Sequence, residues 1–339
     1  MTASAASGPR AGAGSGREAW DGRLRALVSP APLLQSWGYG ETQAHEGWAV
    51  ERLALPGGGR ATVLLQGRGP LRRAYVPRGP LPARGDVVAR LAAWARERRL
   101  TRLRVEPEAG PELGPALREL GFRPAPTFHP RHTLLVPLGG EEEMLASLKP
   151  KHRYNLRLAQ RRGVCVEEAA DAEELARQSQ ATALRQRISL PQVAVYRRRL
   201  KLLDWCRTYV ARHEGRAIAA ILVARFDGRA YYLFGGASGE RRELMPAYLL
   251  QWRAMRAAAA AGCRDYDLWG VPPGPDPGHP WHGLWQFKTG FGGRPVELCG
   301  AWELTLSRPR LALGEAAGAA RRLAGRVRRA AGDLYSPAG

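Results

Sequence analysis

Residues 148–163 read LKPKHRYNLRLAQRRG, and this basic stretch separates two halves of the chain that carry similar sets of predicted strands and helices. Pro150 ends a predicted helix over 141–148, and Gly163 is the expected C-cap of a second helix over 151–162. Because neither half shows a regular strand–helix alternation, the pattern predicts an α+β fold with two domains of similar size and mixed sheets flanked by helices.

The predicted elements follow hydrophobic periodicity, with Gly and Pro at their ends. Predicted strands cover 49–55, 61–67, 72–76, 102–106, 132–137, 208–213, 217–226, 230–237 and 265–271, and one long final strand covers 296–306. Predicted helices cover 86–99, 112–120, 172–186, 193–206, 240–261, 281–289 and 311–334. In the helix over 151–162, Tyr154 and Leu158 are expected to pack inward, beside a stripe of arginines.

The charge of the chain is strongly positive, with 52 Lys and Arg residues against 31 Asp and Glu residues among 339, and a net charge of +21. Such a field attracts polyanions such as nucleic acid, anionic lipid or phosphorylated substrates. An arginine-rich coding bias is the alternative, but it does not explain the shortage of acids. No apolar run reaches the length of a membrane span. The four separated cysteines are typical of free thiols in a reducing cytosol.

Lysine is rare, because only four of the 52 cationic side chains are lysines. Lys288 lies in the sequence WQFKTGFG at 285–292. A compact ammonium fits a narrow site that stabilises one developing oxyanion better than a planar guanidinium does. The alternative is that the four lysines survived by chance, and for Lys201 this alternative stays open.

Several common motifs are absent from the sequence: there is no phosphate-binding P-loop, no G-x-G-x-x-G and no G-x-S-x-G. Two H-x-x-H segments, at 129–132 and 279–282, each contain a proline and lack a nearby third ligand. We therefore predict no metal site, and expect these histidines to bond the backbone.

Seven segments, taken together and in order, resemble the FemABX family of peptidoglycan bridge-forming aminoacyltransferases. They are LQSW at 34–37, YVPRGP at 75–80, RVEPE at 104–108, LKPKHRYNLR at 148–157, LMPAYLLQW at 244–252, YDLWG at 266–270 and QFKTGFG at 286–292. The resemblance implies two GNAT-like domains that transfer an amino acid from aminoacyl-tRNA to a side-chain amine on the stem peptide of a precursor. That precursor is lipid II or UDP-MurNAc-pentapeptide.

The resemblance also implies a short form of the family, because nothing between residues 171 and 206 is long enough for a helical arm. We expect a disordered lead-in over 1–20, a first domain over 21–148 plus 307–335, and a second domain over 149–306. We expect a cytoplasmic monomer without a cofactor. Its arginine-studded C-terminal helix is expected to make peripheral contact with the inner face of the membrane, or simply to dock on the protein surface.

The resemblance assigns the expected catalytic residues. Lys288 stabilises the oxyanion, and Glu106 accepts a proton from the attacking amine. Relatives have Asp at the position of Glu106. The alternatives are a substrate carboxylate as the base and a structural role for Glu106 in pairing with an arginine.

The resemblance also assigns binding residues. Arg185 is the expected ligand of the precursor's diphosphate. Gln43 stands where the family often has a lysine that also binds the phosphates. We therefore expect the phosphate contact of the first domain to be made by Arg78 or to be weaker. Phe287 either stacks on the terminal adenine of tRNA or packs in the core. The further expected substrate-binding residues are Trp37 and Tyr248. The expected tRNA-binding residues are Lys149, Lys151, Arg153, Arg157 and Arg161, although the arginine stripe is equally typical of an ordinary solvated face.

Two other functions stay open at this level. One is acyl transfer from acyl-CoA on the same fold, which the missing glycine-rich pyrophosphate loop disfavours. The other is a basic protein that binds RNA or membranes and catalyses nothing.

Overall fold

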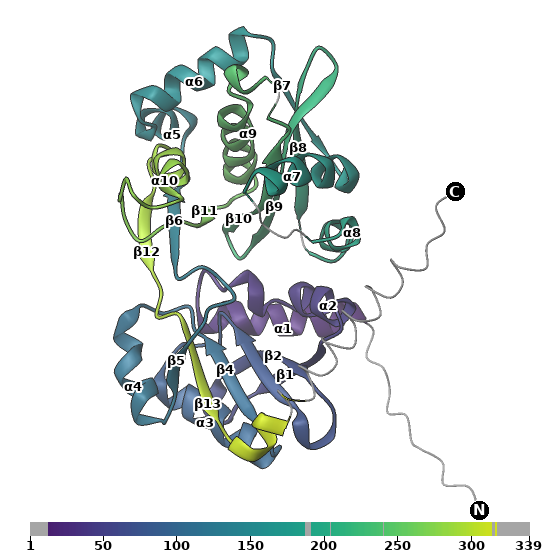
Figure 1. Ribbon diagram of the computed structural model, residues 1–339, viewed down its shortest axis with the longest axis vertical. Helices are drawn as coiled ribbons and strands as arrows, with labels where there is room; N and C mark the ends of the chain where they lie inside the picture. Colours follow the sequence, from purple (N-terminus) through teal and green to yellow (C-terminus); the bar gives the residue numbers. More distant parts are fainter. Residues whose placement is uncertain (1–12, 187–190, 204, 240, 314–315, 317–339) are drawn as a thin grey trace, which may run out of the picture.

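The computed structural model describes residues 13–186, 191–203, 205–239, 241–313 and 316, and it contains two sheets, one above the other in Figure 1. The first sheet has the strand order β1-β2-β3-β4-β13-β5 and the second has the order β12-β6-β11-β10-β9-β8-β7. Each sheet is antiparallel except for one parallel pair, β3 with β4 in the first and β10 with β11 in the second. The predicted α+β class with mixed sheets is confirmed.

The strand bounds are as follows. The first sheet contains β1 (Ala49–Ala54), β2 (Arg60–Gln66), β3 (Arg73–Pro77), β4 (Arg102–Glu106), β13 (Ala301–Thr305) and β5 (Arg123–Ala125). The second contains β12 (Arg294–Glu297), β6 (His132–Pro137), β11 (Asp265–Gly270), β10 (Arg229–Ala237), β9 (Arg216–Phe226), β8 (Cys206–His213) and β7 (Cys165–Ala169).

The two halves of the chain exchange strands. β6 comes from the N-terminal half but pairs with β11, and β13 comes from the C-terminal half but pairs with β4. In Figure 1, the chain runs from β12 in the upper sheet to β13 in the lower sheet. The predicted boundaries at 148/149 and 306/307 therefore do not coincide with sheet membership, which changes between β5 and β6 and again between β12 and β13.

The long strand predicted over 296–306 is wrong, because β12 and β13 are separate and belong to different sheets. Gly300 lies between them with φ +76°, a left-handed conformation that only glycine adopts without strain. The alternation of apolar residues continues through this turn, which is why the sequence reads as one strand.

The helices cover the sheets and join them. Their bounds are α1 (Ala13–Leu27), α2 (Trp37–His45), α3 (Gly85–Glu97), α4 (Gly114–Glu119), α5 (Glu141–Ser147), α6 (Pro150–Arg161), α7 (Ala172–Gln186), α8 (Val193–Leu202), α9 (Pro246–Ala260) and α10 (His282–Thr289). Among the described helices none exceeds 15 residues, so the part of the second domain that is described has no long arm.

Two predictions about local structure are corrected. Residues 13–20 of the expected disordered lead-in form the start of α1, because Trp20 and Leu24 are buried against the rest of the protein. Tyr154 of α6 points outward and is 58% exposed, because His152, Asn155, Leu156 and Ala159 form the buried face of that helix. The helix predicted over 311–334 lies almost entirely outside the described residues.

Three apolar clusters form the core. One packs α3 and α4 on the first sheet, and another packs α6 and α9 on the second. The third joins the domains, because Trp20, Leu34 and Tyr39 of the first half pack with Tyr196 and Tyr231 of the second. Hydrogen bonds cross the same boundary, including one from Ala31 N to Asp227 Oδ2 at 2.7 Å. The domains are thus held together by a shared apolar core.

Candidate active site

The parallel strands of the second sheet separate into a fork. β10 and β11 pair at Arg229–Asp265, Ala230–Tyr266 and Tyr231–Asp267, and beyond these positions the described parts of the two strands are not paired. The pairing of β10 with β9 shifts in register between Tyr232 and Phe234, just beyond the last pair of β10 with β11. The place where the two strands cease to pair, which we call the fork, is bordered by Tyr232 of β10 and by the end of β11.

The amine of Lys288 lies in this fork. Lys288 is 5% exposed, and its Nζ donates a 2.8 Å hydrogen bond to the backbone oxygen of Gly270, the last residue of β11. The same nitrogen lies 5.5 Å from the centroid of the Tyr232 ring on β10. Burial lowers the pKa of the Lys288 ammonium to about 8, and the charge of Asp267 partly opposes this shift. Lys288 is thus a buried donor whose proton can move near neutral pH.

An aromatic cluster positions the helix that carries Lys288. His152 of α6 packs against Tyr248 and Phe291 with ring centroids 4.9 Å apart in each pair, and its Nε2 lies 2.7 Å from the Phe287 oxygen. Lys149 N donates to Gly290 O at 2.9 Å, which ties the start of α6 to the end of α10. A side chain at Gly290 would overlap the His152 ring. Phe287 and Tyr248 are half-buried members of this cluster, with centroids 5.2 Å apart.

Glu106 is fully bonded. Its carboxylate is 1% exposed and accepts from Tyr75 Oη at 2.7 Å, Phe128 N at 2.5 Å and His129 N at 3.2 Å. Three donors to one buried carboxylate are typical of a structural acceptor that holds a loop. The role of Glu106 as a base stays a prediction, and it requires the release of one of these bonds.

Arg78 lies at the boundary between the domains. Its backbone is left-handed with φ +51°, and its guanidinium donates to Pro130 O at 2.8 Å and lies 5.9 Å from the Trp269 ring centroid. It lines a cavity of about 300 Å³ to which both domains contribute. Gln43 and Trp37 lie apart from this cavity: Gln43 donates to Glu46 at 3.3 Å, and the Trp37 ring stacks under Arg52 at 3.6 Å. The side chain of Arg185 lies outside the described residues, although its backbone belongs to α7.

The basic residues predicted to bind tRNA gather on α6, beside α10. Lys149, Lys151, Arg157 and Arg161 are exposed, as an ion-binding surface requires. Arg153 is half-buried instead, and donates to the carbonyls of Ala146, at 3.0 Å, and Leu148. Four of the five residues therefore present free surface, and Arg153 closes the C-terminal end of α5.

Seven charged or aromatic residues at the cavity were not singled out individually from the sequence: Glu108, Arg229, Tyr231, Asp267, Trp269, Arg294 and Glu297. Of these, Glu108 was quoted only as part of RVEPE, and Asp267 and Trp269 only as part of YDLWG. An acid between apolar residues in the middle of a strand is the signal that identifies Asp267, because such a position is buried on both faces of a covered sheet.

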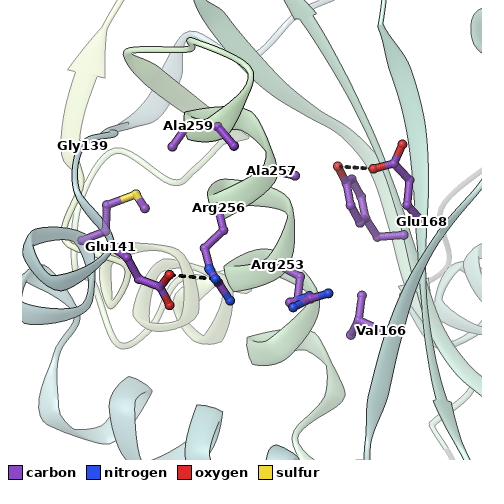
Figure 2. A pocket seen from close by; sticks show the side chains of 11 residues that line it. Gly139, Glu141, Val166, Glu168, Arg253, Arg256, Ala257 and Ala259 are labelled. Carbon is purple, nitrogen blue, oxygen red and sulfur yellow. Dashed lines mark hydrogen bonds and ion pairs between the residues drawn. The ribbon is translucent and has the colours of Figure 1, made fainter.

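A larger pocket of about 530 Å³ lies elsewhere on the second domain and is shown in Figure 2. Its charged groups are largely paired, as Arg256 bonds Glu141 at 2.7 Å and Glu168 accepts from Tyr209 at 3.4 Å. None of the predicted site residues lines it. The fork and the interdomain cavity are therefore the candidate active site.

The fold and the fork define a tandem GNAT-like protein. The structure is similar to the crystal structure of FemX, with a TM-score of 0.77 and 20% identity, over 88% of this chain and 98% of that one. It is also similar to a tandem GNAT protein from the clavulanic acid biosynthesis pathway, with a TM-score of 0.53 and 14% identity, over 86% of this chain and 96% of that one.

Sequence comparison finds similarity over part of the chain. A model of the FemAB family matches residues 207–318. The lipid II:glycine glycyltransferase of Staphylococcus haemolyticus (strain JCSC1435) is 30% identical over 101 residues, which are 30% of this chain and 24% of that protein. The enzyme of the same name from Staphylococcus aureus (strain USA300) is 31% identical over 96 residues, which are 28% of this chain and 23% of that protein. The match therefore spans about a quarter of the length of these relatives. The similarity to the FemAB family thus lies in the C-terminal part of the chain, over residues 207–318.

No helix within the described ranges combines the length and the apolar character needed to cross a bilayer.

Proposed function

We propose that this protein transfers an amino acid from aminoacyl-tRNA to a side-chain amine of a peptidoglycan precursor, forming an amide. The observation that carries the proposal is the buried Lys288 amine in the fork, bonded to Gly270 O at 2.8 Å. Two relatives over part of this chain are named lipid II:glycine glycyltransferase, and this name supports a stem-peptide acceptor. The exposed basic residues on α6 lie next to the helix that carries Lys288, which supports a polyanionic donor there.

In the proposed reaction the acceptor amine attacks the ester carbonyl of the charged tRNA. A C–N bond forms, the C–O bond to the terminal ribose breaks, and the released ribose hydroxyl takes a proton. The carbonyl oxygen carries negative charge in the tetrahedral intermediate, and the Lys288 ammonium stabilises it by turning from Gly270 O to this oxygen. With a pKa of about 8, most of this amine is charged at neutral pH, and burial strengthens its effect on the oxyanion.

The remaining residues receive roles in binding. Arg78 is placed to contact the precursor at the interdomain cavity, and Phe287 to stack on the terminal adenine of the tRNA. Arg185, Gln43, Trp37 and Tyr248 remain proposed contacts of the precursor. The proposal also places the protein in the cytoplasm as a monomer, in peripheral contact with the membrane surface where a lipid-linked precursor is available.

The test is to incubate the protein with mixed charged tRNAs and either lipid II or UDP-MurNAc-pentapeptide, and to measure the mass of the precursor. We expect a mass increase equal to one amino-acid residue, abolished by RNase treatment of the donor. An increase that requires acyl-CoA and releases free thiol would instead identify the acyl-CoA enzyme. RNA or membrane binding with no product from any donor would identify a binding protein.

A further inference from the structure

The interdomain cavity has a mixed, mostly buried lining. The first half of the chain contributes Leu34, Arg78 and Glu108, and the second contributes Tyr231, Asp267 and Trp269. Asp267 and Tyr231 pair directly across β11 and β10, at the base of the fork that holds the Lys288 amine. Strand β11 thus contributes Asp267 to the cavity wall and, three residues later, the Gly270 oxygen that accepts from Lys288.

Three of the charged groups in this lining already have partners. Glu108 and Arg229 form an ion pair at 2.8 Å, with side chains 20% and 12% exposed. Arg78 donates to Pro130 O at 2.8 Å and lies against the Trp269 ring. These contacts involve Glu108, Arg229 and Arg78, and none of them is a bond to the nearby carboxylate of Asp267.

Asp267 is only partly satisfied. Its Oδ1 accepts from the Thr133 hydroxyl and from Trp269 N, the latter at 2.8 Å. No residue in the described part of the chain bonds its Oδ2, although the side chain is 5% exposed and lines the cavity. Burial raises the pKa of Asp267, whereas these two bonds and the charges of Arg229 and Arg78 oppose the rise. A buried carboxylate with a free oxygen that faces a cavity is a binding group for a cation or a donor.

We propose that Asp267 binds the primary amino group of a substrate in this cavity. This proposal rests on the proposed function, because it assigns a binding group for one of the two substrates of that reaction. Two substrate amines have this chemistry: the α-amino group of the amino acid on the tRNA, and the side-chain amine of the acceptor. Tyr231 and Trp269 add aromatic rings to the same wall, and such rings favour an ammonium.

The first test measures amine binding without any transfer. Glycinamide and its hydroxyl counterpart glycolamide are titrated into the full chain, and binding is followed by ligand-observed NMR. We expect glycinamide to bind the wild type at least ~10-fold more tightly than glycolamide, and Asp267→Asn to abolish this preference, because charge-assisted hydrogen bonds are the stronger class. Asparagine keeps an oxygen for Thr133 and Trp269, so the local fold is retained.

Two further variants make the test specific. Asp265→Asn removes the same charge two residues away on β11, outside the cavity lining, and should leave the preference unchanged. Ala109→Leu fills part of the cavity without touching the charge, and should weaken glycinamide binding even if Asp267→Asn fails to fold. Equal binding of glycinamide to the wild type, Asp267→Asn and Ala109→Leu overturns the inference.

The second test separates the two sources by using a donor tRNA whose α-amino group has been converted to a hydroxyl. If Asp267 binds the donor, the wild type prefers the aminoacyl form by ~10-fold or more and Asp267→Asn loses that preference. If Asp267 binds the acceptor, the preference is the same in both proteins and the KM for the acceptor rises in the variant. Glycinamide binding that depends on Asp267, without any transfer by the wild type, contradicts the proposed function and leaves the amine site standing.

Discussion

The Nζ of Lys288 and the backbone oxygen of Gly270 are joined by a 2.8 Å hydrogen bond inside the fork between β10 and β11. Lys288 is the one buried lysine among the described residues, and this bond fixes its amine where the pairing of β10 with β11 ends. The surrounding protein removes water from the amine and supplies one neutral acceptor, which a substrate oxyanion can replace.

The pH dependence of Lys288 gives the first prediction. Since its pKa lies at about 8 and not at the ordinary 10.5, the ratio of wild-type to Lys288→Ala turnover should fall as the pH rises through about 8. Taking the ratio cancels the titration of the acceptor amine, which both proteins share. Single-turnover rates measured from about pH 6 to about pH 10 provide the test. A ratio that stays constant to the upper end of this range contradicts the proposed role of the ammonium.

The same shift affects stability with a defined sign. Because folding lowers the pKa, the unfolded chain binds more protons between about pH 8 and pH 10.5, so the contribution of Lys288 to stability rises with pH in that window. Lys288→Met should remove this dependence in urea unfolding.

The contact of Gly290 with His152 gives a prediction with a matched control. Gly290→Ala should destabilise the protein by about 1–3 kcal/mol, because its methyl group would overlap the His152 ring that holds α10 in place. Gly283→Ala, on the same helix with no atom within 4 Å of the new methyl, should be neutral or slightly stabilising. Thermal unfolding measures both. Equal effects of the two substitutions would mean that His152 does not position α10.

Basic residues on α6 give a prediction about donor binding. Arg157→Ala and Arg161→Ala should each weaken tRNA binding and reduce the slope of log Kd against log salt by ~1, if each contacts one phosphate. Arg84→Ala removes an exposed arginine that is paired with Asp86 in the first domain, and should leave the slope unchanged. Filter binding over a range of salt concentrations provides the measurement. Equal slopes for the wild type and all three variants would show that Arg157 and Arg161 of α6 do not contact the tRNA.

Glu106 can be tested by separating stability from turnover. We expect Glu106→Gln to lower the free energy of unfolding by about 1–3 kcal/mol, because the new amide group faces one of three existing donors. The transfer rate, measured at a temperature where the variant is folded, then decides between the two roles, because an almost unchanged rate would leave Glu106 as a structural acceptor only. Normal stability combined with a loss of ~10²-fold in rate would instead support Glu106 as the base.

Much of this architecture could be predicted from the sequence. The division into two α+β halves follows from periodicity, and the bounds of α6 follow from Pro150 and Gly163. The strand exchange could not be predicted, because an alternating pattern specifies a strand but not its partner. The turn at Gly300 is hidden for the same reason, since alternation continues on both sides of it.

The site was predictable only in part. Lys288, Arg78 and Phe287 are marked by residue type and motif, and the structure places them at the fork, the cavity and the aromatic cluster. The role of Asp267 depends on which of its oxygens is bonded and on a cavity to which both domains contribute. Those features come from long-range packing, which a single sequence does not specify. The bonded state of Glu106 is hidden in the same way, because its donors lie 22 and 23 residues away along the chain and on Tyr75.

The most direct measurement is the single-turnover rate of amino-acid transfer by Lys288→Ala, compared with Lys201→Ala, which removes an exposed lysine on α8. The account predicts that Lys288→Ala is slower than the wild type by ~10²–10³-fold with an unchanged fold, as for the loss of one oxyanion donor, and that Lys201→Ala is normal. A folded Lys288→Ala variant that transfers at the wild-type rate would contradict it.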